Sequence, residues 1–483
     1  MRTKTKLAAP YRFLLLGLLV IMVACAINPV TGKKEFMLVT NADEMALGKQ
    51  TDILVTEQYG IYPDQKLQEY LTQVGLKIVP NTHRPDLPYT FKVVDTDIVN
   101  AFAVPGGYVY FTRGIMAYLN DEAEMAGVMG HELGHVSARH TAEQITKSQV
   151  VQLGFGLGSM LSETFRQYAG LANFGVELLF LRFSRDNERQ SDDLGVEYST
   201  KSGYDANRMA DFFVTLERMQ PSDGSAVPAW FSTHPNPVDR VTAVKAKTNE
   251  WQAKYPNQKF AVNQEEYLQK LDGIVFGPDP RQGYVQAQTF YHPTLTLKFA
   301  VPVDWQVNNL PSQVQMAPKT QDAVMLFTIA KEADPASAAA QFVSQANANV
   351  SKNVATKVNG MPAQELQADI LSGQDTVRVL SYFIQKENQV FVFHGVSSRD
   401  KFASFMPNFL STMTSFDQLR DPRFLNVKPK RLRIERVRTE GTLRQVLAEL
   451  SVAQTTYDQV SLLNGMMLDD PVRNGTLLKI IVQ

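Results

Sequence analysis

Cysteine is almost absent from this chain, whose 483 residues include one, Cys25. A single thiol excludes an intrachain disulfide framework and any zinc or iron–sulfur site built from several thiolates. An excess of charge is also missing, since 48 basic and 49 acidic residues leave a formal net charge of −1. The overall charge therefore gives no reason to expect nucleic acid as a partner. With 44% hydrophobic and 20% charged residues, a chain of this length is predicted to form several globular domains.

The first residues, 1–25, are predicted to be a lipoprotein signal peptide. Basic residues without any acidic one precede an apolar run at 13–24. This run is shorter than the roughly 20 residues that cross a bilayer as a helix, which disfavours a permanent membrane span. Residues 22–25 resemble a bacterial lipobox, and the resemblance implies that Cys25 is lipidated. Ala26 beside it favours the outer membrane over the inner one, and the alternative is an ordinary cleaved signal with an incidental cysteine.

Hydrophobic periodicity predicts an α-rich first domain with a small sheet. Apolar residues three and four positions apart predict helices at 42–49, 67–78, 120–149, 184–202 and from 205 onward. Alternating apolar residues predict strands at 89–94 and 107–112. Prolines at 221–240 and a polar stretch with a Gly-Pro-Asp-Pro turn follow. We therefore place this domain at 26–260 and a linker at 261–285.

The remainder of the chain is predicted to form two smaller domains. Strand-like and helical segments alternate over 286–420, which predicts an α+β accessory domain, and a basic linker follows at 421–432. The last segment, 433–483, is predicted as strand, helix, helix, strand, and it resembles a LysM module in its Gly-Thr-Leu start, Leu-Asn pair and closing strand. That resemblance implies contact with peptidoglycan. The alternative is a small adaptor domain that contacts an envelope protein.

The most informative motif is His131-Glu132-Leu-Gly-His135 within the predicted helix at 120–149. Positions i and i+4 share a helix face, so both imidazoles can bind one metal ion. Glu132 lies where it can reach a water molecule at the metal without being a ligand. A catalytic zinc site has three protein ligands and one open position, so the sequence predicts one zinc ion per chain and a third ligand elsewhere.

Two residues are candidates for the third ligand. His140 lies five residues past His135, whereas the metzincin pattern places its third histidine six residues past. Glu188 is the favoured candidate, because Glu188 and Asp192 form another i, i+4 pair. The first carboxylate can bind zinc while the second accepts the N–H of a ligating histidine and fixes its tautomer.

Four motifs, at 100–107, 131–140, 184–192 and 232–240, resemble one family of gluzincin metallopeptidases. This family includes the CAAX prenyl endopeptidase, HtpX-type proteases and periplasmic quality-control proteases, and the match covers about residues 40–245. The resemblance implies that Glu132 is the general base of peptide hydrolysis. It also places His234 on a loop over the metal, where it either assists catalysis or occupies the open position and keeps the enzyme latent.

The same resemblance implies a substrate cleft beside the strand at 107–112. Tyr108, Val109 and Tyr110 would pair their backbone with an extended peptide, a mode that tolerates many substrate sequences. Arg240 would steady the loop of His234 or contact the substrate carbonyl. The insert at 150–181, which contains several glycines, is predicted to be a lid, a surface that faces a membrane or partner, or a core helical hairpin.

The fold class that we predict is multidomain: an α-rich α+β peptidase domain of zincin type, then an α+β domain, then a small LysM-like βααβ domain. The predicted function is hydrolysis of unfolded or misassembled envelope proteins by a zinc endopeptidase. The protein would be lipid-anchored on the periplasmic side of the envelope, in the outer membrane rather than the inner, without a nucleic-acid partner. The alternatives are an envelope chaperone with a latent zinc site and a cell-wall-binding scaffold.

Overall fold

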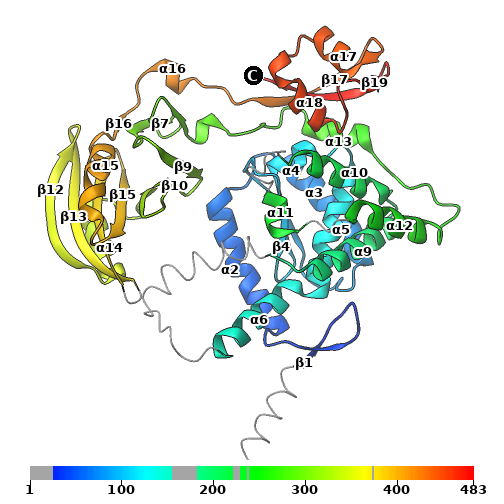
Figure 1. Cartoon of the computed structure of the whole chain (residues 1–483), viewed down its shortest axis with the longest axis horizontal. Helices are drawn as coiled ribbons and strands as arrows, with labels where there is room; N and C mark the ends of the chain where they lie inside the picture. The colour runs from blue at the N-terminus through cyan, green and yellow to red at the C-terminus, as the bar shows by residue number, and fades with distance from the viewer. Residues whose placement is uncertain (1–24, 155–181, 221–228, 236–238, 373–374) are drawn as a thin grey trace, which may run out of the picture.

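The structure is a computed structural model of the chain and describes residues 25–154, 182–220, 229–235, 239–372 and 375–483. Figure 1 shows an N-terminal domain (residues 25–276), a β-rich middle domain (284–418) set apart from it, and a C-terminal module (431–483) lying against the first domain. The predicted signal peptide up to residue 24 and residues 155–181 of the insert lie outside the described residues. Within the described ranges, no helix has the length and apolar character needed to cross a membrane.

A three-stranded sheet lies inside the N-terminal domain, in the order β3 (Thr90–Val94), β5 (Tyr108–Thr112), β4 (Ala101–Val104). β5 is parallel to β3 and antiparallel to β4. One face of the sheet packs against α3 (Gln65–Ile78) and α5 (Glu122–Ala138), and the other packs against α2 (Asn41–Tyr59). Both predicted strands are present, and β4 is an additional strand that forms one edge of the sheet.

The helix predicted at 120–149 is two helices in the structure. α5 ends at Ala138, Arg139 adopts the left-handed conformation with φ of 60°, and α6 (His140–Gly154) follows. The Arg139 side chain is buried and donates to Glu44 Oε1 and to the carbonyl of Val39. These contacts join segments about a hundred residues apart, so the helical period of the sequence does not predict the break.

The remaining helices of the N-terminal domain surround α5. They are α4 (Arg113–Tyr118), α9 (Arg185–Lys201), α10 (Asn207–Arg218), α11 (Ala229–Thr233) and α12 (Arg240–Gln252), with the 3₁₀ turn η1 (Val79–Asn81) after α3. The predicted helix at 184–202 is confirmed, and Gly203, with φ of 87°, follows it. In Figure 1, α9, α10 and α12 lie beside α5 on one side of the domain.

The structure differs from the linker predicted at 261–285. Residues 264–271 form α13 (Gln264–Leu271), and its Tyr267, Leu268 and Leu271 are buried in the same hydrophobic core as α5. Residues 274–276 continue this core. The eight-residue helix is too short for its apolar period to stand out among polar neighbours, so the composition of the segment suggested a linker.

The middle domain is built on a seven-stranded antiparallel sheet in the order β12-β13-β14-β15-β11-β10-β9. These strands are β9 (Trp305–Leu310), β10 (Gln313–Pro318), β11 (Ala323–Ile329), β12 (Asn349–Val358), β13 (Met361–Ser372), β14 (Asp375–Lys386) and β15 (Gln389–Ser398). Helix α14 (Pro335–Ala346) packs on one face and α15 (Phe402–Thr414) on the other. A second sheet follows the order β16-β8-β7-β6, with strands β16 (Asp417–Gln418), β8 (Leu297–Ala300), β7 (Thr289–His292) and β6 (Tyr284–Gln286).

The C-terminal module has the predicted order of strand, two helices and strand. Its elements are β17 (Arg431–Arg436), α17 (Leu443–Glu449), α18 (Tyr457–Leu463) and β20 (Leu477–Val482), with a short pair of β18 (Gly441–Thr442) and β19 (Pro471–Val472). Short turns complete the chain: η3 (Pro280–Gln282), α16 (Pro422–Leu425) and η4 (Gln454–Thr456). Leu432 and Leu463 of the module are buried in the core of the N-terminal domain. The module is therefore docked onto that domain.

Candidate metal centre

Helix α5 brings two histidines to one place. Asp121 caps its first turn by accepting from the backbone N–H of Glu124, and every residue of the helix is buried. His131 and His135 share a face of this helix as predicted, with their Nε2 atoms 3.0 Å apart. A helix that is buried on all sides can hold a metal site away from bulk water.

Helix α9 supplies Glu188 in its first turn. Ser184 caps this helix and fixes where it begins. Glu188 is fully buried and points toward α5. The two helices cross closely because glycines face each other: a Cβ on Gly130 would lie 2.9 Å from the carbonyl oxygen of Gly195. This approach places Glu188 Oε2 3.6 Å from His131 Nε2 and Glu188 Oε1 3.5 Å from His135 Nε2.

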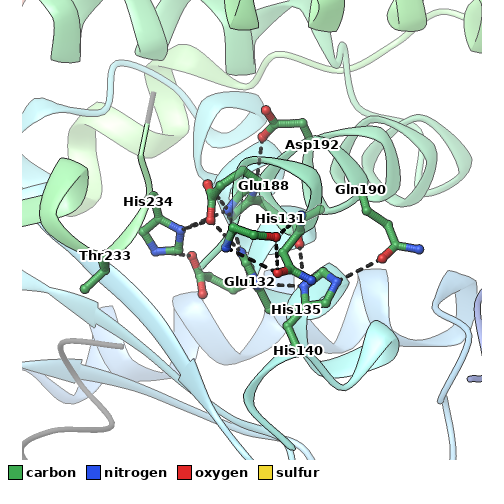
Figure 2. A network of polar contacts seen from close by, with 12 residues as sticks. His131, Glu132, His135, His140, Glu188, Gln190, Asp192, Thr233 and His234 are labelled. Carbon is green, nitrogen blue, oxygen red and sulfur yellow. Dashed lines mark hydrogen bonds and ion pairs between the residues drawn. The ribbon is translucent and has the colours of Figure 1, made fainter. Parts of the chain in front are cut away.

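His234 completes a cluster of four possible ligands. It follows α11 and is 1% exposed, and its Nδ1 lies 3.1 Å from Glu188 Oε1 and 3.3 Å from His131 Nε2. One donor atom from each of His131, His135, Glu188 and His234 lies within 4.8 Å of the others. Figure 2 shows these side chains converging on a common point.

The donor set fits a zinc ion. Imidazole nitrogens and a carboxylate oxygen are the ligands of catalytic zinc sites. Glu188 Oε2 and His234 Nε2 are buried and have no hydrogen-bond partner among the described residues. Buried polar atoms without partners are costly, and a cation among these atoms would compensate the carboxylate charge.

The protonation states also suit a metal. Burial lowers the pKa of His131, and it lowers the pKa of His135 to about 3. Both imidazoles are therefore neutral at pH 7, which is the form that binds a metal ion. Burial by itself would raise the pKa of Glu188, but His234, His135 and His131 around it hold that pKa well below its usual value. Burial opposes a charge on His234, yet the Glu188 and Glu132 carboxylates raise its pKa.

Residues 65–248 match the sequence model of peptidase family M48. This part of the chain is similar to that family, and we call the N-terminal domain that contains it the M48 domain. Three relatives illustrate its range. The beta-barrel assembly-enhancing protease of Yersinia pestis is 30% identical over 43% of this chain and 44% of that protein. The protein of the same name from Escherichia coli strain K12 is 29% identical, also over 43% and 44%.

A third relative comes from a eukaryote. The mitochondrial metalloendopeptidase OMA1 of Schizosaccharomyces pombe is 28% identical over 47% of this chain and 67% of that protein. The match to the bacterial relatives spans less than half of their length, so the similarity concerns the M48 domain alone. These relatives are proteases, which does not favour the chaperone or scaffold alternatives.

Behind the ligands of the M48 domain, Asp192 orients His131. Its Oδ1 lies 2.8 Å from His131 Nδ1, where the i, i+4 pair predicted a carboxylate that accepts the N–H of a ligating histidine. The structure places Arg240 against Asp192, while its predicted contact with the loop of His234 or with the substrate carbonyl stays a prediction. Arg240 is 2% exposed and donates through Nε and one terminal nitrogen to both oxygens of Asp192, at 2.8 and 2.7 Å. The physical reason is that a carboxylate buried this deeply needs a cation beside it.

His140 is a neighbour of the site rather than a member of the four-residue cluster. Its Nδ1 lies 3.0 Å from His135 Nδ1, and its Nε2 lies 2.9 Å from Gln190 Oε1. The structure therefore places Glu188, and not His140, near the Nε2 atoms of both motif histidines. The Nδ1 atom of His135, on the side of the ring away from the cluster, contacts His140. His140 therefore helps to hold His135 in place and is not itself one of the four clustered donors.

Two aromatic contacts were not predicted. Trp230 stacks on His234 with ring centroids 4.3 Å apart, and Phe183 lies 4.1 Å from the ring of His135. Phe183 directly precedes the motif at 184–192, and Trp230 lies two residues before the motif at 232–240. This closeness to the motifs was the signal in the sequence that could have identified them. Both rings are buried, so they cover the sides of the two imidazoles with apolar surface.

Glu132 lies next to His234 in the M48 site. It is 1% exposed, and its Oε1 is 3.7 Å from His234 Nε2 with no hydrogen-bond partner among the described residues. Burial raises the pKa of Glu132 to about 7, while His234, Arg240 and the nearby backbone of Ala103 in β4 act in the opposite direction. The edge strand β4 thus lies directly beside the predicted base.

The role predicted for Tyr108, Val109 and Tyr110 is wrong. Their strand, β5, lies between β3 and β4, so the backbone groups of both its edges are already paired. Tyr110 is also buried, and its hydroxyl donates to Asp52 Oδ1 at 2.7 Å. Pairing with a further strand is possible only at an edge of a sheet, and β4 is the edge nearest Glu132.

Proposed function

We propose that this chain is a zinc-dependent endopeptidase. The observation that carries the proposal is the cluster of His131, His135 and Glu188 with the buried carboxylate of Glu132 beside it. The three ligands would hold one zinc ion. Similarity to family M48 and the protease names of the relatives support the same activity.

The chemistry follows from the positions of the side chains. A zinc ion, when bound, supplies Lewis acidity that activates water and polarises a carbonyl group. Glu132 would accept a proton from the attacking water and deliver it to the leaving amine, and a pKa raised to about 7 suits both steps near neutral pH. Asp192 and Arg240 would keep His131 in the tautomer that presents Nε2 to the metal.

We propose that the substrate binds along β4. This edge strand could add an extended peptide through main-chain hydrogen bonds, which depend little on the substrate's side chains. The contact between Ala103 and Glu132 would then bring a peptide bond close to the base. Unfolded segments meet the requirement for an extended backbone, since folded proteins have their strands already paired.

We also propose that His234 is an inhibitory ligand in this conformation. Four protein donors lie together, whereas a catalytic zinc site keeps one position open for water. His234 lies between α11 and α12, outside the helices α5 and α9 that carry the other three donors, so its side chain could leave the cluster while those helices stay in place. The protease would be latent until substrate or a partner draws His234 away.

The biological setting is proposed from the sequence and the relatives. Cys25 would carry a lipid anchor that attaches the protein to the periplasmic side of the envelope, in the outer membrane. Its substrates would be unfolded or misassembled envelope proteins, an idea that the name beta-barrel assembly-enhancing protease of two relatives supports. The LysM-like C-terminal module would contact peptidoglycan or an envelope protein.

The test compares degradation of an unfolded protein by the wild type and by Glu132→Gln at equal zinc content. The variant should retain zinc and lose about 10²- to 10⁴-fold in cleavage rate, because a general base is removed and no ligand changes. His234→Ala should raise the rate above that of the wild type. If Glu132→Gln cleaves as fast as the wild type, the proposed base is wrong, and if no variant cleaves at any zinc concentration, the endopeptidase proposal fails.

A further inference from the structure

The hairpin at the start of the described chain has one exposed face. Strands β1 (Cys25–Ile27) and β2 (Lys34–Phe36) pair with Ile27 opposite Lys34 and Cys25 opposite Phe36. Residues opposite each other share a face of the pair. Ile27 is 62% exposed, Phe36 is 43% exposed and Lys34 is exposed. We call these three residues the outer face of the hairpin.

The opposite face is fixed to the M48 domain. Ala26 packs against a small core that includes Met37 and Ala142, and Glu35 accepts two hydrogen bonds from Asn28. The Asn28 amide also donates to the carbonyl of Ala138, the last residue of α5. The hairpin is therefore attached to the end of the helix that carries the metal ligands, and its outer face has a defined orientation.

The position of the hairpin in the chain limits what can cover its outer face. The apolar run at 13–24 ends directly before β1. Ile27 is two residues from Cys25, which is at most about 7 Å of extended chain. Any membrane attachment at Cys25 thus brings this face to the bilayer surface. Figure 1 shows β1 at the lower edge of the N-terminal domain, on the side away from the C-terminal module.

We propose that the outer face of the hairpin lies on the surface of a phospholipid bilayer that contains anionic headgroups. Ile27 and Phe36 would enter the interface, while Lys34 and the exposed Lys33 at the turn would contact phosphate groups. One exposed apolar side chain is ordinary, but two on one face beside two lysines match the chemistry of this boundary. The proposal rests on the proposed membrane attachment at Cys25.

The consequence is a fixed orientation of the protease. A lipid anchor alone is a flexible tether. A second contact, made by the outer face of the hairpin, would hold α5 at one angle to the membrane. The hairpin contacts the end of α5, and Leu38 after β2 donates its N–H to Thr146 of α6. The active site would thereby face substrates at a constant distance from the bilayer.

The test is photo-crosslinking of the full chain in bacterial membranes. A diazirine side chain would replace residue 27 or 36, and the control would replace Leu76, which is 53% exposed on α3. We expect phospholipid adducts at 27 and 36 but not at 76. Lys33→Glu with Lys34→Glu should lower the adduct yield at position 36 about fivefold or more, because each lysine near an anionic surface contributes attraction. Equal yields at 27, 36 and 76, or adducts with protein alone, would overturn the proposal.

Its failure can be separated from failure of the endopeptidase proposal. Ile27→Ser with Phe36→Ser should cleave a soluble unfolded protein at the wild-type rate, since neither residue belongs to the metal cluster. An inactive wild type with lipid adducts at 27 and 36 would leave the membrane contact standing. An active wild type without these adducts would leave only the peptidase.

Discussion

His131 is held from both sides of its ring. Its Nε2 faces the other ligands, and its Nδ1 lies 2.8 Å from Asp192 Oδ1. Arg240 binds both oxygens of Asp192 and stacks on Phe213 with 3.9 Å between the guanidinium carbon and the ring centre. At the scale of single residues, the site is thus a chain of contacts from an aromatic ring through a guanidinium and a carboxylate to the metal ligand.

Replacing Asp192 tests this chain. Asp192→Asn removes the charge that balances Arg240 and weakens the orientation of His131, so zinc affinity should fall about 10- to 100-fold. The measurement is zinc competition with a chelator of known affinity. Asp193→Asn is the matched control, because the Asp193 side chain is 56% exposed and its ion pair with Lys247 is long at 3.9 Å. Equal affinities for the two variants would contradict the assignment.

His394 of the middle domain provides a prediction about acid stability. Burial lowers its pKa from 6.5 to about 4, and its ring lies between Phe342 and Phe383 with Nδ1 2.7 Å from Ser381 Oγ. Between these two pKa values the unfolded chain binds a proton that the folded chain does not. The free energy of unfolding should therefore fall by about 1.4 kcal/mol for each pH unit from about 6.5 down to about 4.

Calorimetry of the wild type and His394→Asn at neutral and acidic pH measures this effect. The variant should lose less stability on acidification, because the proton uptake of His394 is gone. Some acid sensitivity should persist, since burial also lowers the pKa of His292 in the same domain to about 4. An unchanged pH dependence would show that His394 does not control it.

At the scale of elements, the crossing of α5 and α9 decides whether the ligands meet. Gly130 and Gly134 of α5 and Gly195 of α9 allow the two backbones to touch. A Cβ on Gly195 would lie 3.0 Å from the backbone nitrogen of His131. The distance between Glu188 and the α5 histidines is therefore set by glycines, which have no side chain and take no part in binding or catalysis.

Gly130→Ala is the corresponding variant. Its Cβ would lie 2.9 Å from the Gly195 carbonyl oxygen, so α9 must shift, and stability should fall by about 1 to 3 kcal/mol with weaker zinc binding. Alanine is by itself the better helix former by about 1 kcal/mol, so any loss measures the clash. Urea unfolding with and without zinc gives both quantities, and a stabilised variant with normal zinc affinity would refute the argument.

At the scale of the whole molecule, the C-terminal module is part of the M48 domain's packing. Lys479 of β20 is fully buried, and its ammonium donates to the carbonyls of Ala117 and Leu119 at 2.9 and 2.8 Å. Burial lowers the pKa of Lys479 to about 7, and the carboxylates of Glu124 and Asp121 oppose this change. The last strand of the chain thus contacts the segment from which the metal-binding helix begins.

We therefore expect the module and the N-terminal domain to unfold together. Lys479→Met leaves the buried Ala117 and Leu119 carbonyls without this donor, so it should lower the temperature of that shared transition, by about 2 to 8 °C for a loss near 1 to 2 kcal/mol. Lys430→Met is the control, since that lysine is exposed. Separate transitions for the two parts in calorimetry, or equal effects of the two substitutions, would contradict the expectation.

The sequence by itself determined what depends on neighbours along the chain. The i, i+4 spacing of His131 and His135 and the position of Glu132 follow from the geometry of one helix, and the structure retains that geometry. The strand, helix, helix, strand order of the C-terminal module is also a matter of local periodicity. Local patterns survive folding because each element forms from its own residues.

Only the tertiary structure decided which distant partners meet. Glu188 rather than His140 joined the motif histidines because two glycine-faced helices cross there. The pairing of β5 on both sides moved the open sheet edge to β4, and Arg240 turned to Asp192 because a buried carboxylate needs a cation. These outcomes depend on packing between segments far apart in the chain, and the period of any one segment carries no information about that packing.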